Sequence, residues 1–87
     1  MNKLENYRDS IDDIDREIVK LLLLRFGIVE KISEYKKKNG IKITDRKRER
    51  QVIANAEEKS GQHRDFASKL FKSIIEYSKN KLSRREF

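Results

Sequence analysis

The sequence predicts an all-α protein that forms a homodimeric helical bundle, with one long first helix and two shorter helices per chain. Three observations predict this fold. Apolar residues recur in steps of three and four from Leu4 to Tyr35, which is the spacing of one helix face. The 87 residues include no proline and only three glycines, and 43% of them are charged. Long amphipathic helices have this composition, so we expect residues 1–87 to form a single helical domain.

The first predicted helix runs from Leu4 to about Lys38. Its apolar residues form a heptad seam, which consists of Leu4, Tyr7, Ile11, Ile14, Ile18, Leu21, Ile28, Ile32 and Tyr35. One member is missing, because position 25 is Arg25, and Arg8 and Lys36 lie in the neighbouring column. A helix of about 35 residues spans roughly 50 Å, whereas a compact chain of this size is roughly 30 Å across. We therefore expect a second copy of the chain to cover the seam.

The second predicted helix follows Asn39 and Gly40, which end the first helix because glycine accepts a positive φ. Thr44 or Asp45 is expected to cap it, and it runs to about Lys59. On one face of this helix, charged residues continue the apolar stripe toward the amino end. That face reads Asp45, Arg48, Glu49, Val52, Ile53 and Ala56. Because an unpaired buried charge is costly, the three charged residues indicate either a structural ion-pair network or a polar ligand.

The third predicted helix runs from about Arg64 to Leu82, after a break at residues 60–63. Its expected inner stripe is Phe66, Ala67, Leu70, Phe71, Ile74, Ile75, Ser78 and Leu82. Ser78 lies one turn after Ile74, on or beside the apolar face. A serine at such a position most often bonds back to its own helix.

Cations recur on or beside these apolar faces, at Arg8, Arg25, Lys36 and Arg48. Each has an ordinary structural explanation. Arg25 alone would be interpreted as a seam arginine that snorkels or fixes the register, and Arg8 and Lys36 as solvated surface residues. Taken together, they leave a surplus of positive charge that calls for an anionic guest. Arginine binds carboxylates in a bidentate manner, so a small polycarboxylate fits this pattern.

Other classes of site are disfavoured by composition. The chain has no cysteine and a single histidine, His63, so we expect neither a metal centre nor thiolate chemistry. No glycine-rich phosphate loop and no nucleophile with an attendant base is present, so we expect no cofactor and no covalent catalysis. No apolar run is long enough for a signal peptide or a membrane span, and a cytoplasmic location is the default expectation.

The net charge of +7 also admits a nucleic-acid-binding module or a plain dimerising coiled coil. Against the first, the basic residues are spread over several faces and match no recognised nucleic-acid-binding motif. The second explains the seam but not Arg25 or the charged face that begins at Asp45. We therefore expect a small-molecule partner rather than nucleic acid or a membrane.

The combined pattern resembles the all-helical class of chorismate mutases, which are small intertwined dimers with three helices per chain. The matching residues are Arg8, Arg25, Lys36, the Asp45-x-x-Arg48-Glu49 motif and Ile74-Ile75-Glu76-x-Ser78. The resemblance covers nearly the whole chain, and the spacing from Arg8 through Glu49 fits without a gap. Each member alone is a weak signal, whereas the combination is specific. It implies the rearrangement of chorismate to prephenate, a step toward phenylalanine and tyrosine, without a cofactor.

The resemblance also implies a role for each matching residue. Arg25 and Arg48 would hold substrate carboxylates, and Arg8 would reach in from the partner chain of the homodimer. Lys36 would donate a hydrogen bond to the ether oxygen as its bond breaks.

In the same way, Glu49 and Asp45 would meet the ring hydroxyl, and Ser78 would lie near a carboxylate. The chain departs from the family pattern at one position. One turn after the serine the family usually has glutamine or glutamate, and here that residue is Leu82, with Lys81 before it. This leaves three alternatives: that Lys81 or another group serves there, that catalysis is weaker, or that the chain is a silent relative or a lyase acting on isochorismate.

Overall fold

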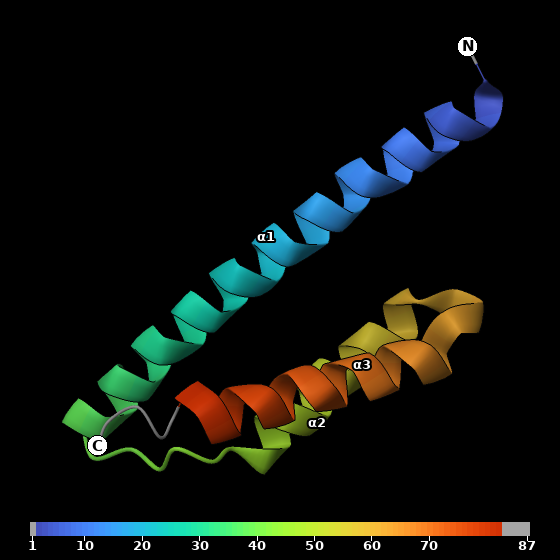
Figure 1. Ribbon diagram of the computed structural model, residues 1–87. Helices are drawn as coiled ribbons and strands as arrows, with labels where there is room; N and C mark the ends of the chain where they lie inside the picture. The colour runs from blue at the N-terminus through green and yellow to red at the C-terminus, as the bar shows by residue number, and fades with distance from the viewer. Residues whose placement is uncertain (1, 83–87) are drawn as a thin grey trace.

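The computed structural model describes residues 2–82, and these form three α-helices and no strand. The α-helices are α1 (Lys3–Lys38), α2 (Arg46–Lys59) and α3 (Arg64–Tyr77), with a short 3-10 helix, η1 (Gly61–His63), before α3 and a π-helical turn, η2 (Ser78–Leu82), after it. In Figure 1, α2 and α3 form an antiparallel pair. This pair lies close to α1 at the carboxyl end of α1 and diverges from it toward the amino end. The all-α prediction with a long first helix is confirmed.

The first helix makes the chain elongated. Its amino end is capped by Asn2, whose Oδ1 accepts a hydrogen bond of 2.8 Å from the backbone N–H of Leu4. The chain measures 58 × 27 × 16 Å, and its radius of gyration is 16.6 Å, whereas a compact chain of this length would have about 12 Å. The amino-terminal half of α1 therefore projects beyond the other helices (Figure 1).

The turn after α1 depends on a glycine, as the sequence predicts. Gly40 has a φ of +66°, and the backbone N–H of Ile41 bonds back to the carbonyl of Lys36 at 2.8 Å. Residues with a Cβ rarely adopt this backbone conformation.

We expect Gly40→Ala to lower the free energy of unfolding by about 1–2 kcal/mol, because alanine is strained at a positive φ. Gly27→Ala is the matched control, since Gly27 lies inside α1 and an added Cβ would meet nothing within 4 Å. That control should stabilise the protein by up to about 1 kcal/mol, through helix propensity. Chemical denaturation measures both variants, and equal effects would contradict the role given to Gly40.

The second helix starts with an acidic cap. The Oδ1 of Asp45 accepts a hydrogen bond of 3.0 Å from the backbone N–H of Arg48, so Asp45 rather than Thr44 is the N-cap. The helix ends at Lys59, as predicted, and Gly61 takes a φ of +56° in the following break.

The predicted third helix, from about Arg64 to Leu82, is α-helical to Tyr77 and continues as a π-helical turn from Ser78 to Leu82. Ser78 Oγ donates a hydrogen bond of 2.8 Å to the carbonyl of Ile74, and its backbone N–H is shared between the carbonyls of Ile74 and Ile75. A serine that bonds back four residues competes with the helical ladder and often bends the helix. The rings of Phe26 and Tyr77, with centroids 5.1 Å apart, join α1 to this end of α3.

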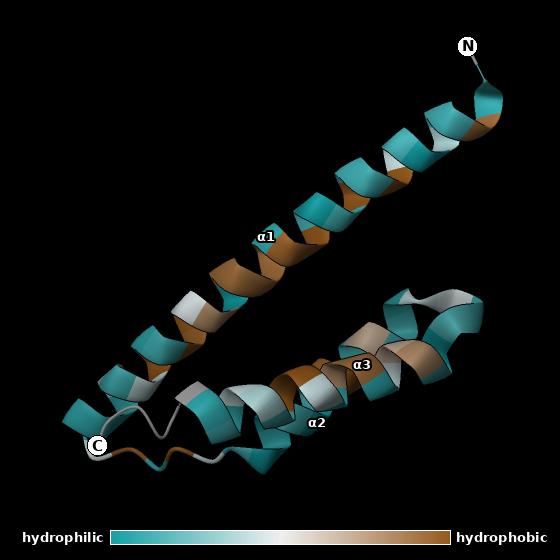
Figure 2. Cartoon of the chain, viewed as in Figure 1, coloured by the Kyte–Doolittle hydropathy of each residue, from teal (hydrophilic) through white to brown (hydrophobic). Residues whose placement is uncertain are grey.

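One chain buries little apolar surface by itself. Ala67 is the single buried hydrophobic residue in the part that the structure describes, and no large side chain there is fully buried. Figure 2 shows apolar residues all along α1, including the half that projects beyond the other helices. Phe66 and Leu70, two members of the predicted stripe of α3, are also exposed in the single chain. None of the helices from residue 2 to residue 82 has the length and apolar character needed to cross a membrane.

Candidate functional site

A cavity of about 320 Å³ lies between the carboxyl half of α1, the connector to α2, the first turns of α2 and the end of α3. Small-molecule sites usually have volumes of roughly 300–1,000 Å³. Its polar lining consists of Arg25, Ser33, Lys36, Asp45, Arg48, Glu49, Ser78 and Lys79, and its apolar lining of Ile28, Val29, Ile32, Ile43, Val52 and Ile75. Six of the seven residues singled out in the sequence therefore surround one cavity.

The first helix supplies two cations to the cavity. Arg25, Val29, Ile32 and Lys36 follow one another in steps of four, three and four, so they share one helix face. Arg25 and Lys36 are both half-buried. The Nζ of Lys36 donates a hydrogen bond of 3.2 Å to the backbone carbonyl of Ile43 in the connector. This bond fixes the position of the ammonium group while leaving donors for a guest.

The second helix supplies its first turn. Asp45, Arg48 and Glu49 all line the cavity, but in the described residues each has a different partner. Asp45 caps the backbone N–H of Arg48, as described above. Arg48 Nη1 donates to Gln51 Oε1 at 2.8 Å, and the carboxylate of Glu49 pairs with Lys79. The three side chains are therefore not held together as a network of their own.

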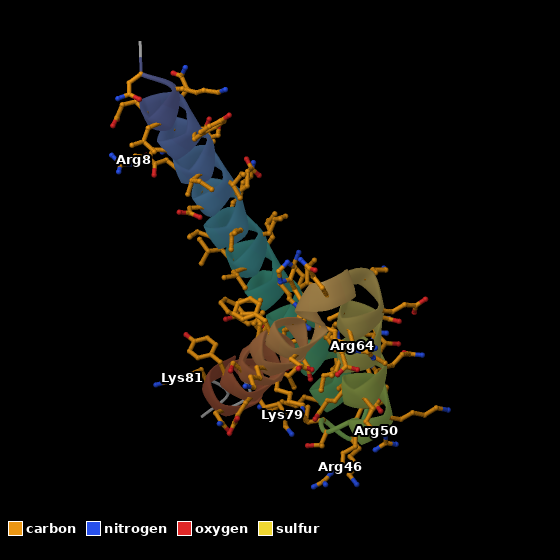
Figure 3. All side chains as sticks on the ribbon, turned by 90° about the vertical axis from the view of Figure 1, so that its right-hand side faces the viewer. Arg8, Arg46, Arg50, Arg64, Lys79 and Lys81 are labelled. Carbon is orange, nitrogen blue, oxygen red and sulfur yellow. The ribbon has the colours of Figure 1, made fainter. Side chains whose placement is uncertain are left out.

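The end of α3 closes the cavity. Ser78 is buried, and its hydroxyl bonds back to Ile74, which is the ordinary structural arrangement for a helical serine. The next residue, Lys79, places its Nζ 3.3 Å from Glu49 Oε2. Lys81 is exposed and is not part of the cavity lining. In Figure 3 Lys79 and Lys81 leave the helix in different directions. The side chain of Leu82 lies outside the described residues.

Arg8 is the predicted site residue that the single chain keeps away from the cavity. It pairs with Glu5 at 3.1 Å, its side chain is 65% exposed, and Figure 3 shows it near the free end of α1. Arg25 follows Arg8 by 17 positions in the sequence, which corresponds to about 25 Å of helix. No side-chain movement within one chain closes that distance.

Two polar lining residues, Ser33 and Lys79, were not among the predicted site residues. Ser33 is buried and lies three residues before Lys36, which is one helical turn. This spacing was the available signal. Lys79 lies four residues after Ile75, but a lysine near the end of a helix is ordinarily explained by the helix dipole.

The charge of the cavity suits an anion with two negative groups. Arg25, Lys36, Arg48 and Lys79 supply four positive charges, and Asp45 and Glu49 supply two negative ones. The surplus of two positive charges lies beside an apolar wall, where a charge pair is stronger than in water. Residues 2–82 contain no cluster of three histidine, cysteine, aspartate or glutamate side chains that could hold a metal ion.

Comparisons with known proteins point to one family. The family model for chorismate mutase type II matches residues 7–81. A chorismate mutase of Methanocaldococcus jannaschii is 30% identical over 82 residues, which cover 91% of this chain and 83% of that protein. A bifunctional chorismate mutase/prephenate dehydratase of Buchnera aphidicola is 36% identical over 80 residues, which cover 88% of this chain. These residues are 21% of that longer protein. No solved structure gave a significant match.

Proposed function

Because the chain belongs to the chorismate mutase type II family, we propose that it is an isomerase that converts chorismate to prephenate. The observation that carries this proposal is the convergence of six predicted site residues on one cavity with a surplus of two positive charges. Chorismate is a dianion, so its charge complements that surplus. We further propose that residues 1–87 act as a single domain.

The reaction needs little chemistry from the protein. It is pericyclic and unimolecular, so the protein need not supply a nucleophile, a metal or an acid that transfers a proton. Two things accelerate it. The first is holding the substrate in its compact reactive shape, which is an orientation effect. The second is fixed positive charge where the ether oxygen gains electron density as its bond breaks.

The cations of the cavity have distinct proposed roles. Arg25 and Arg48 bind the two carboxylates, because a guanidinium group can form paired hydrogen bonds to a carboxylate. Lys36 donates to the ether oxygen. Its tether to the carbonyl of Ile43 supports this role, because the ammonium is held in place before the substrate arrives.

The remaining lining residues orient the ring. Glu49 accepts a hydrogen bond from the ring hydroxyl, and Asp45 assists it while capping α2. Ser78 lies at the carboxylate end of the substrate. Its hydroxyl donates to Ile74, so an oxygen lone pair and a small rotation remain available for a polar neighbour.

We propose that the working form is a homodimer in which Arg8 of one chain reaches the cavity of the other. The seam of α1 supports this assembly, because Ile11, Ile14 and Ile18 are each at least half exposed in the single chain. A second copy covers this seam and, by twofold symmetry, receives the same residues in return. The dimer thereby completes a site that one chain leaves without Arg8.

The direct test follows the loss of chorismate absorbance on addition of the purified chain. We expect turnover by the unmodified chain, and a decrease of about 10- to 100-fold in kcat/KM for Arg25→Ala, because hydrogen bonds to charged groups contribute about 1.5–3 kcal/mol. Arg46→Ala is the matched control, since Arg46 is exposed and outside the cavity lining. Absence of turnover in the unmodified chain, or its restriction to isochorismate, would overturn the proposed function.

A further inference from the structure

The pair formed by Lys79 and Glu49 joins two helices at the mouth of the cavity. Lys79 comes from the π-helical turn η2, Glu49 from the first turn of α2, and both side chains line the cavity. Their charged atoms are 3.3 Å apart, with side chains that are 43% and 27% exposed. The pair is therefore partly shielded from water, which strengthens it relative to a fully exposed pair.

Helix geometry favours both partners where they stand. A carboxylate is stabilised in the first turn of a helix, and a cation in the last turn. Glu49 lies in the first turn of α2, and Lys79 lies in the η2 turn that follows α3. The two side chains meet because α2 and α3 run antiparallel. Ser78, where α3 ends and the π-helical turn begins, directly precedes Lys79 in the sequence.

Lys79 pairs with one oxygen of the Glu49 carboxylate, Oε2, and the ionised carboxylate keeps further lone pairs that can accept a hydrogen bond from a guest. The charge balance of the cavity depends on the same lysine. Without Lys79, the surplus of positive charge would fall from two to one, and the charge of Glu49 would repel an anionic guest.

We propose that Lys79 is a positioning residue for the reaction, which acts through Glu49 by fixing its carboxylate and by offsetting its charge. This inference rests on the proposed function, because it concerns the same substrate. Lys79 is not required to touch the reacting atoms. Its effect is on how tightly the dianion binds and on how Glu49 meets the ring hydroxyl.

The test compares Lys79→Met, Lys79→Arg and Lys72→Met with the unmodified full chain. Steady-state kinetics with chorismate gives kcat and KM, and thermal unfolding reports the fold. We expect Lys79→Met to lower kcat/KM by about 10-fold, mainly by raising KM, which is about 1.4 kcal/mol. Lys79→Arg should recover most of this loss. Lys72→Met, an exposed lysine of α3 outside the cavity lining, should behave as the unmodified chain.

A second comparison separates positioning from a structural role. In a Glu49→Gln background, Lys79→Met should change KM by less than about threefold, because the charge that Lys79 offsets has gone. An equal loss in both backgrounds, or kinetic constants for Lys79→Met within about twofold of the unmodified chain, would overturn the inference while leaving the proposed function intact. An unmodified chain that does not convert chorismate would instead overturn the proposed function, and this inference with it. If Lys79→Met unfolds, Lys79→Gln, which also removes the charge, replaces it in both backgrounds and is judged by the same outcomes.

Discussion

Lys36→Met is expected to lower kcat by about 100- to 1,000-fold, which corresponds to removing one preorganised donor at the atom that gains charge. The reason lies in the position of the ammonium group. It is half-buried, it is held at 3.2 Å from the carbonyl of Ile43, and it faces the cavity beside Arg25. Methionine keeps the length of the side chain and removes only the charge and the donors. KM should change much less than kcat, because the lost interaction forms mainly in the transition state.

The matched control for this variant is Lys38→Met. Lys38 is an exposed residue in the last turn of the same helix and does not line the cavity. It should leave kcat unchanged. Circular dichroism should show equal helicity in both variants, since the bond from Lys36 to the connector is a single contact. A Lys36→Met chain that retains kcat within about threefold of the unmodified value would remove Lys36 from the chemical step.

Ile14→Asp is expected to abolish the homodimer and with it most of the folded structure. Ile14 lies in the middle of the α1 seam and is 53% exposed in the single chain. Burying an isoleucine contributes about 1.5–3 kcal/mol, and twofold symmetry doubles this loss in the dimer. Burying two aspartates against the seam adds a desolvation cost of several kcal/mol per ion. The sum of these costs is comparable to the whole stability of a typical small domain, about 5–15 kcal/mol.

Sedimentation equilibrium and far-ultraviolet circular dichroism measure this result. The unmodified chain should sediment as a dimer with the helical content of α1, α2 and α3, whereas Ile14→Asp should sediment as a poorly helical monomer. Lys20→Asp is the control, because Lys20 lies on the same helix at an exposed position outside the seam. A dimeric, helical Ile14→Asp chain would show that α1 does not provide the interface.

The sequence allowed the local features of this fold to be predicted well. Helix α1 was predicted within one residue of its observed bounds, and Gly40 and Asp45 act as predicted at the helix ends. These features depend on neighbours a few residues away, so they can be derived from spacing and propensity. The residues of α1 and α2 that face the cavity were predicted from spacing in the same way. Spacing was therefore enough to predict that Arg25, Lys36 and Glu49 would face inward.

Features that depend on a contact between distant segments were not predictable in this way. The π-helical turn arises because Ser78 and the backbone compete for one carbonyl, and this is not visible in a periodicity. The partner of Glu49 depends on how α3 lies against α2. The exposure of Phe66 in the single chain likewise depends on what covers α3, which hydrophobicity alone does not specify.

The near absence of buried apolar residues within one chain has a consequence for how this protein behaves as its abundance changes. If two chains must meet before either has a core, folding and association are a single equilibrium. Its free energy then shifts with every change in the number of molecules per volume, by about 1.4 kcal/mol for each tenfold dilution. In a cell that makes little of this protein, a smaller fraction of the chains would be folded and active. The activity per chain would therefore depend on the level of expression.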